Sequence, residues 1–163
     1  MTAADRPPIL ITGGCGRIGL LLGPPSGRQL HFHTARPPTA DLGLPCVQAD
    51  IADLAAIRSH FTGQDTVVHL AADPRHTAPW ASLLPNNIIG TYNVLQAAQE
   101  AGCRRVILAS SLHAVLGYGP EVVVRGDMPP RPADLYGASK AWAEALGHVY
   151  AQRGLSVLCV RIG

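Results

Sequence analysis

The sequence contains no apolar run of about 18 residues, the length that a membrane-spanning helix needs. Its arginines are scattered and its net charge is only +2, so it lacks the basic patch typical of nucleic-acid binding. We expect no signal peptide in the N-terminal residues, because they lead directly into the first expected strand. We therefore expect a cytoplasmic protein with neither a membrane nor a nucleic-acid partner.

Cysteine and histidine are present, but without the spacings that metal sites need. The four cysteines form no CxxC pair. Cys103 and Cys159 lie in or beside expected strands as small core residues, whereas Cys15 is either an oxidisable thiol or a loop filler. His31 and His33 alternate along a strand and share one face, but no third ligand accompanies them. We expect no metal site.

Strand-like and helix-like segments alternate along the 163 residues, of which 47% are apolar. This alternation predicts an α/β fold in one domain, with a doubly wound parallel sheet in the strand order 3-2-1-4-5-6. Ligands of such sheets bind beyond the carboxyl ends of the strands. The expected strands are Pro8–Thr12, Leu30–Ala35, Cys46–Ala49, Thr66–Ala71, Arg105–Ser110 and Ser156–Ile162.

Four helices are expected between these strands. The first follows Gly19 and is short, because Gly23-Pro24-Pro25 breaks it. The second is Asp53–Phe61, with Asp53 as its N-terminal cap. The third is Trp80–Ala101 and the fourth is Tyr136–Arg153, each followed by a glycine that ends it.

Helical spacing also predicts which residues of the two long helices share a face. In the third helix they are Ile88, Tyr92, Leu95 and Gln99, and in the fourth Trp142, Leu146, Val149 and Tyr150. The proline-rich segment 117–132 is expected to be a loop over the carboxyl end of the fifth strand, where it could contribute to a site.

A glycine-rich loop follows the first strand, with the spacing Gly13-x-x-Gly16-x-x-Gly19. In a dinucleotide site, one such glycine permits a tight turn, one lets the main chain approach a pyrophosphate, and one lets the helix pack against the sheet. The free N–H groups and the dipole of the following helix favour an anion at that point. The loop therefore predicts a dinucleotide site, the alternative being a glycine-rich turn without a ligand.

Tyr136 and Lys140 lie four residues apart at the start of the fourth helix and so share a face of it. A nearby ammonium favours the phenolate, so we expect Lys140 to lower the pKa of Tyr136. A tyrosine with a lowered pKa can exchange a proton with an alcohol oxygen while a hydride moves elsewhere. Alone, the spacing is typical of surface pairs, but together with the glycine loop it favours a catalytic pair.

Five segments in order along the chain resemble the extended short-chain dehydrogenase/reductase family, in its NAD-dependent epimerase/dehydratase group. They are Thr12–Gly19, Asp50-Ile51, His69-Leu-Ala-Ala72, Asn87-Ile-Ile-Gly-Thr-Tyr-Asn93 and Tyr136-xxx-Lys140. The resemblance implies a Rossmann-type NAD(P)-binding domain over residues 1–163. It also implies an oxidoreductase that transfers a hydride to or from a sugar or sugar acid.

Within this family, three further stretches are similar to uronate dehydrogenases, which oxidise the anomeric hydroxyl of a hexuronic acid to a lactone. They are Ala109-Ser-Ser-Leu-His113, Pro79-Trp80 and Arg131-Pro-Ala-Asp-Leu-Tyr-Gly-Ala-Ser-Lys140. Such enzymes use NAD and a small sugar-acid substrate.

The resemblance also implies roles for single residues. Tyr136 would be the acid/base, Lys140 would tune it and bind the nicotinamide ribose, and Asn87 would support the proton relay. Ser111 would assist in catalysis and would face the substrate together with His113. The remaining cofactor contacts would be Gly13, Gly16, Arg17, Ile18 and Gly19 at the pyrophosphate, Asp50 and Ile51 at the adenine, and Leu70, Ala71 and Ala72 along the ribose side.

Two residues depart from the family pattern. Counting back three from Val115 gives Leu112 where a hydroxyl is usual, so Ser111 can serve only if the main chain shifts there. No acidic residue ends the second strand, where NAD-binding members carry one for the ribose 2′-OH. Arg36 could instead receive the 2′-phosphate of NADP, or merely stack on the adenine, so we expect NAD or NADP with a lean to NADP.

Members of the family continue well beyond the point that matches Gly163 and build most of their substrate region there. Three hypotheses remain open: a sugar or sugar-acid dehydrogenase, a nucleotide-sugar epimerase or dehydratase, and a non-catalytic dinucleotide-binding module. The resemblance further implies a homodimer through the two long helices. Leu95, Trp142 and Tyr150 could supply that interface, or could pack on the chain's own sheet.

Overall fold

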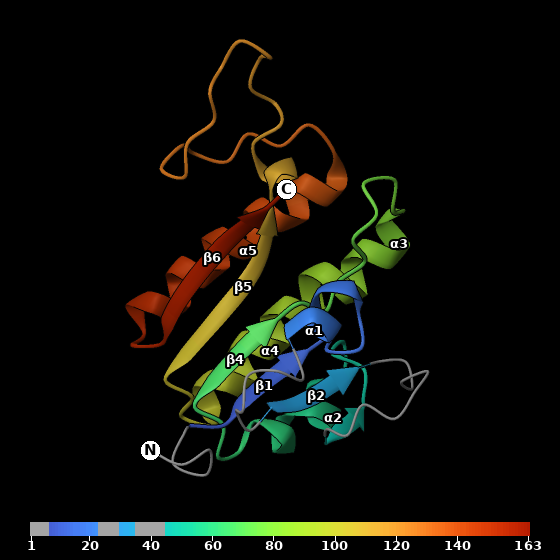
Figure 1. The fold of residues 1–163 in the computed structure, drawn as a ribbon, viewed down its shortest axis with the longest axis vertical. Coiled ribbons are helices and arrows are strands. Elements are labelled where there is room, and N and C mark those ends of the chain that lie inside the picture. The colour runs from blue at the N-terminus through green and yellow to red at the C-terminus, as the bar shows by residue number, and fades with distance from the viewer. Residues whose placement is uncertain (1–6, 23–29, 35–44) are drawn as a thin grey trace.

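A computed structural model of the protein describes residues 7–22 and 45–163, together with the main chain of residues 30–34. Six parallel strands form one sheet in the order β3-β2-β1-β4-β5-β6, which confirms the predicted fold class and strand order (Figure 1). Their bounds are β1 Ile9–Thr12, β2 Leu30–Thr34, β3 Cys46–Gln48, β4 Thr66–His69, β5 Arg105–Ser111 and β6 Ser156–Ile162.

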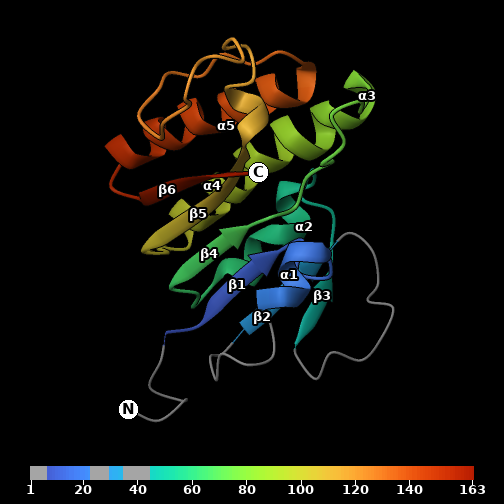
Figure 2. The same cartoon turned by 45° about the horizontal axis from the view of Figure 1, so that its top comes forward.

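In the described part of the chain, helices lie on both faces of this sheet. Helices α2 (Leu54–Arg58), α4 (Gly90–Glu100) and α5 (Leu135–Gln152) lie on one face, and α1 (Arg17–Leu22) lies on the other, against β1 (Figure 2). α1 is described as far as Leu22, and the break predicted for it at Gly23-Pro24-Pro25 lies outside the described residues. No helix in the described part of the chain is both long and apolar enough to cross a membrane.

The core lies between the sheet and the three helices on its covered face. Leu10, Val67, Val106 and Leu108 project from alternate positions of the strands into one cluster. The helices meet them with fully buried residues, namely Ile57, Val94, Leu95, Ala97, Ala98 and Tyr150. Leu95 and Tyr150 therefore pack on the chain's own sheet, which was one of the two alternatives for them.

The predicted helix faces were partly wrong. Val149 is 43% exposed, although it was expected in the apolar stripe of the fourth helix. Tyr92 is 44% exposed, whereas Leu95, which was expected on the same face, is fully buried. The buried side of α4 is instead centred on Thr91, Val94 and Ala98. Small residues let this side approach its neighbours: at Gly90, an added Cβ would collide with the Ile51 side chain.

The predicted helix Trp80–Ala101 is divided into three parts. α3 (Trp80–Leu83) leads into a π-helical turn, Leu84–Ile89, and then into α4. Pro85 lies in this turn and has no N–H for a helical hydrogen bond. The chain widens locally, and the Gly90 N–H bonds to the carbonyl of Pro85. Such turns often occur at functional sites, and this one directs Asn87 into the interior.

Candidate active site

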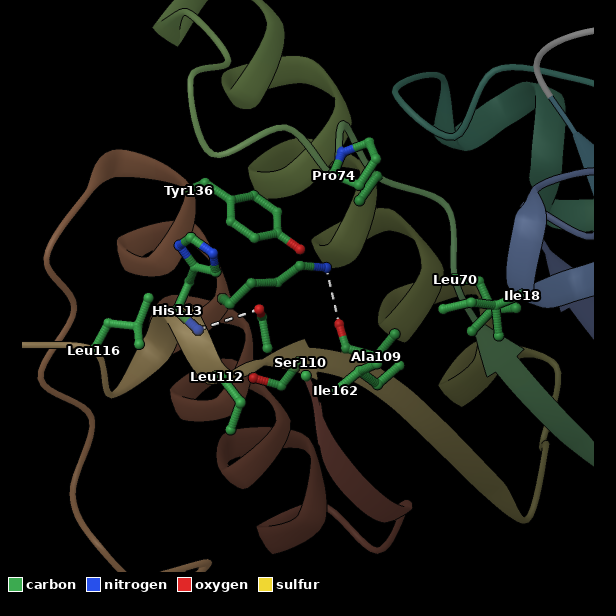
Figure 3. A pocket seen from close by; sticks show the side chains of 14 residues that line it. Ile18, Leu70, Pro74, Ala109, Ser110, Leu112, His113, Leu116, Tyr136 and Ile162 are labelled. Carbon is green, nitrogen blue, oxygen red and sulfur yellow. Dashed lines mark hydrogen bonds between the residues drawn. The ribbon is translucent and has the colours of Figure 1, made fainter. Parts of the chain in front are cut away.

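A cavity of about 430 Å³ opens at the carboxyl edge of the sheet. Figure 3 shows Ile18 and Leu70 at one end of it and Tyr136, His113 and Leu116 at the other. Seven residues that the sequence assigned to the site line this cavity: Ile18, Leu70, Ala72, Ser111, His113, Tyr136 and Lys140.

The glycine loop is shaped by close approaches of the main chain. Gly13 has a φ of 71°, and a Cβ there would lie 2.7 Å from the main-chain nitrogen of Ala71. A Cβ on Gly19 would collide with the carbonyl of Gly14, so only glycine lets α1 start this close to the loop. The Gly16 N–H bonds to the carbonyl of Gly13 at 2.9 Å and closes the turn. Any side chain at these glycines would fill the space above the loop. Without one, the shape of the loop fits the pyrophosphate of a dinucleotide.

The predicted adenine contacts are placed by α4 rather than by their own strand. Asn93 donates a hydrogen bond from Nδ2 to the carbonyl of Ile51 at 2.8 Å. Asp50 is exposed, and its Oδ1 accepts from the Ala52 N–H at 2.9 Å. The segment after β3 is thereby held beside the sheet. Arg36, the residue behind the predicted lean to NADP, lies outside the described residues, as do the side chains of His31 and His33.

Tyr136 and Lys140 lie together in the interior, each only 8% exposed. The Lys140 Nζ lies 5.7 Å from the centre of the Tyr136 ring. It donates a hydrogen bond to the carbonyl of Ala109 at 2.8 Å. α5 places both residues because Asp134 caps its first turn, accepting from the Gly137 N–H at 2.6 Å.

The expected effect of Lys140 on the Tyr136 pKa was wrong for this arrangement. Burial raises the pKa of Tyr136 above its ordinary value, and the carboxylates of Asp134 and Asp73 add to the rise. The Ser111 hydroxyl acts in the opposite direction. Burial also lowers the pKa of Lys140 to about 8, because its ammonium has been removed from water. Desolvation therefore dominates both groups, and Tyr136 is a neutral phenol at neutral pH.

Ser111 occupies the place that the sequence left in doubt. It is buried, lines the cavity, and accepts a hydrogen bond from the His113 N–H at 3.2 Å. Leu112 starts the short 3₁₀ turn Leu112–Ala114 and points its apolar side chain to the rim, where it is 43% exposed. Ser111, and not the residue after it, is thus the hydroxyl beside Tyr136.

His113 is held by partners that sequence reasoning missed. Its Nδ1 lies 2.7 Å from the Asp134 carboxylate. Its ring lies edge-on to Tyr136, with centroids 5.4 Å apart, and is stacked with His76, with centroids 5.9 Å apart. The sequence around His76, including the proline that follows Asp73, contains no pattern that predicts its contact with His113. Only the fold brings the segment after β4 to the end of β5.

Asn87 has a positioning role in this structure. Its Oδ1 accepts from the Asp73 N–H at 2.8 Å, and its Nδ2 donates to the Asp73 carbonyl and to the Ser139 Oγ, both at 3.1 Å. Asp73 in turn is paired with Arg75 and accepts from Ser82, and these contacts hold the pKa of its carboxyl well below its usual range. The predicted relay residue thus joins the segment after β4 to α5.

A second polar network joins the end of β5, which lines the cavity, to α5 and β6. Ser110 donates from Oγ to Glu144 at 2.6 Å, and Glu144 forms a bidentate pair with Arg161 at 2.8 Å. Arg161 also donates to the carbonyl of Met128 at 3.0 Å, which ties the loop 117–132 to β6. Neither charged residue was recognised from the sequence, because they belong to α5 and β6 and show no local motif.

No group of three or more potential metal ligands occurs among the residues that the structure describes.

The remaining predicted cofactor residues surround the glycine loop. Arg17 is exposed at the start of α1, and Ala71 backs Gly13.

The sequence profile of the NAD dependent epimerase/dehydratase family matches residues 9–163. The NAD-dependent glucose-6-phosphate dehydrogenase of Haloferax volcanii is 37% identical over 177 residues, covering 96% of this chain and 68% of that protein. The uronate dehydrogenase of Agrobacterium fabrum is 36% identical over 161 residues, covering 95% of this chain and 60% of that protein.

A solved variant of the Agrobacterium tumefaciens uronate dehydrogenase, complexed with NAD, matches with a TM-score of 0.84 at 31% identity. That match covers 93% of this chain and 58% of the other. The chain thus spans between 58% and 68% of the length of these three relatives. The names of two of them, the glucose-6-phosphate dehydrogenase and the solved variant, specify NAD and give no support to the predicted lean to NADP.

Proposed function

The chain belongs to the NAD dependent epimerase/dehydratase family, and from this premise we propose that it is an NAD-binding oxidoreductase of sugars or sugar acids. The observation that carries the proposal is the shape of one cavity. Ile18, beside the glycine loop, lies at one end of it, and the buried pair of Tyr136 and Lys140 lies at the other. A dinucleotide held by the loop would extend along the cavity towards the phenol.

Bound NAD would supply the hydride acceptor, and the chain's own residues would handle the proton. Tyr136 holds its proton on Oη at neutral pH because burial raises its pKa. It is therefore set to donate to a carbonyl oxygen in the reductive direction. In the oxidative direction it must first lose that proton, so oxidation should accelerate as the pH rises. Ser111 would hydrogen bond the same substrate oxygen.

Lys140 would stabilise negative charge that develops on Tyr136. With a pKa of about 8, it is mostly charged at neutral pH although it is buried. His113, fixed by Asp134, would present its remaining ring nitrogen to the substrate. The likeness to uronate dehydrogenases favours a hexuronic acid as the substrate, and the likeness to a glucose-6-phosphate dehydrogenase favours another aldose derivative.

A non-catalytic dinucleotide-binding module is the second candidate. One observation favours it: Leu112, 43% exposed at the rim of the cavity, stands where the family pattern has a hydroxyl. A homodimer through α4 and α5 stays a proposal in either case. The side chains that those helices leave exposed for it include Tyr92 and Val149.

The first experiment is a calorimetric titration with NAD, NADH, NADP and NADPH, followed by a screen of aldoses and uronic acids for nicotinamide reduction. We expect micromolar binding of NAD and turnover of at least one sugar acid. The Tyr136→Phe variant should bind NAD normally and lose about 10²–10⁴-fold in turnover. The matched control is Tyr92→Phe, on the exposed side of α4.

The outcomes separate the candidates. NAD binding without turnover of any sugar would favour the non-catalytic module. Equal turnover by Tyr136→Phe and the wild type would remove Tyr136 from the chemistry. Binding of none of the four dinucleotides below the millimolar range would contradict the proposal altogether.

A further inference from the structure

Two thiols meet at the base of the glycine loop. The Sγ atoms of Cys15 and Cys46 lie 3.6 Å apart, although the residues are separated by 31 positions in the sequence. Cys15 belongs to the loop, and Cys46 is the first residue of β3. Both are free thiols of intermediate exposure, and both pack against the small apolar cluster around Ile11.

We propose that Cys15 and Cys46 form a reversible disulfide when a peroxide oxidises the protein, and that this bond weakens dinucleotide binding at the glycine loop. The first part concerns the chain alone. The second part rests on the proposed function, because it requires the loop to be a working dinucleotide site.

The reaction balances with one peroxide. The Cys15 thiol releases its proton, the thiolate attacks a peroxide oxygen, and the O–O bond breaks to give a sulfenic acid and hydroxide, which takes up the released proton to form water. The Cys46 sulfur then attacks the sulfenic sulfur, the S–O bond breaks, and the thiol proton leaves with the hydroxide as a second water. Two thiols are oxidised and one hydrogen peroxide is reduced. A reducing dithiol reverses the step by exchange.

The environments of the two thiols indicate which of them reacts first with the peroxide. Burial raises the pKa of the Cys46 thiol to about 11, and the hydrogen bond with Cys15 adds to the rise. Cys46 therefore keeps its proton and is a poor first nucleophile. Cys15 is half-buried and lies in the loop next to the exposed Gly16, where a peroxide can reach it. Cys103 is buried beside Phe61 and has no thiol partner among its described contacts.

Formation of the disulfide should distort the loop, because Cys15 must move towards Cys46 while the glycines beside it are already in close contact with their neighbours. The sulfur atoms of a disulfide lie about 2.05 Å apart, so these two must approach by about 1.5 Å. Gly13 is already against Ala71, and Gly14 is already against the start of α1 at Gly19. A shift of Cys15 towards β3 therefore moves the neighbouring main-chain N–H groups away from the position where they would meet a phosphate.

The test uses the whole chain, treated with hydrogen peroxide or with dithiothreitol. Mass spectrometry after alkylation should show the loss of two thiols and a linked pair of peptides containing Cys15 and Cys46. Calorimetry should show NAD binding about tenfold weaker in the oxidised protein, equivalent to about one lost hydrogen bond to the phosphate. Dithiothreitol should restore both readouts.

Cys46→Ser should bind NAD as the reduced wild type does and keep that affinity after peroxide. Cys159→Ala, on the other side of the sheet, should still form the bond. Absence of a Cys15–Cys46 link would overturn the proposal, as would a linked protein with unchanged affinity. If the reduced protein does not bind NAD at all, the proposed function fails, whereas disulfide formation is still decided by the mass measurement.

Discussion

The two ends of the cavity are built in different ways. At the loop end, residues 12–19 with Leu70 and Ala71, the shape comes from glycines that let main-chain atoms approach one another. At the tyrosine end, residues 110–113 with the first turns of α5, the shape comes from side chains that hold each other by hydrogen bonds. The shape of the loop end depends on glycines, which have no side chain, and the shape of the tyrosine end depends on side chains that are hydrogen bonded to one another.

This difference predicts how each end responds to substitution. A side chain added at the loop end blocks the cradle, but it removes few of the interactions that hold the fold. A partner removed at the tyrosine end leaves a buried polar group without its hydrogen bond, which costs stability directly. Substitutions at the loop end should therefore affect binding more than stability, and those at the tyrosine end should do the reverse.

The strongest test of the tyrosine end is Glu144→Gln. Glu144 and Arg161 are only 13% and 15% exposed, and loss of one partner leaves the other charge poorly compensated. We expect the free energy of unfolding to fall by about 3 kcal/mol, the lower end of the range for a buried pair, measured by urea denaturation. The matched control is Glu100→Gln, whose pair with Arg58 lies on the surface and should contribute little. Equal losses in the two variants would contradict the buried network.

The corresponding test of the loop end is Gly19→Ala. The added Cβ would lie 2.6 Å from the Cα of Gly14, so the loop must move away from α1. We expect NAD to bind about 100-fold more weakly, or about 2.7 kcal/mol, with a smaller loss of stability. Gly126→Ala is the control, because a Cβ there meets nothing within 4 Å. Binding that survives Gly19→Ala unchanged would show that this loop does not hold the dinucleotide.

The third prediction concerns the buried ammonium at the tyrosine end. The pKa of Lys140 is about 8 in the folded protein, against an ordinary value of 10.5. Between these values the unfolded chain binds more protons, so the cost of burying the charge is present below about pH 8 and is relieved as the pH rises. The stability of the wild type relative to Lys140→Met should increase by about 1.5 kcal/mol from about pH 7.5 to about pH 9.5.

Urea denaturation of both proteins across this range measures that difference. Desolvation raises the pKa values of the Cys46, Cys103 and Cys159 thiols to about 11, and these thiols also influence stability in alkali. They are present in both proteins and cancel in the comparison. A flat difference would mean that Lys140 keeps its ordinary pKa.

The contrast between the ends also explains what the sequence could predict. The strand order and the place of the glycine loop between β1 and α1 were predicted correctly, because both follow from local patterns: alternating segments, and glycines three residues apart after a strand. The Tyr136–Lys140 pair was recognised for the same reason, as its spacing lies within one helix.

The contacts that surround that pair could not be predicted, because each joins segments that are distant in sequence. Glu144 meets Arg161 across α5 and β6, and His113 meets His76 across the ends of two strands. The effect of Lys140 on the Tyr136 pKa was predicted wrongly because spacing says nothing about burial, which dominates both groups. The π-helical turn at Pro85 was missed because the flanking residues show uninterrupted helical spacing.

The smallest expected change in stability concerns Asp134, whose carboxylate makes two different contacts. It caps α5 through Gly137 and also holds His113. Asp134→Ala should lower stability by about 1 kcal/mol through the lost cap. It should also reduce sugar turnover with little change in NAD affinity, because His113 loses its orientation. Asp53→Ala, which removes only the cap of α2, should lower stability without changing turnover.

The pH dependence gives this prediction a second readout. Burial raises the pKa of Asp134, but the Gly137 N–H and His113 outweigh it, so the pKa lies below its ordinary value. The stabilisation is therefore complete above the ordinary pKa of an aspartate and is lost as the pH falls through the lowered one. The stability difference between the wild type and Asp134→Ala should shrink in acid. A difference that persists there would mean that helix capping by the neutral carboxyl, and not the charge shared with His113, accounts for the effect.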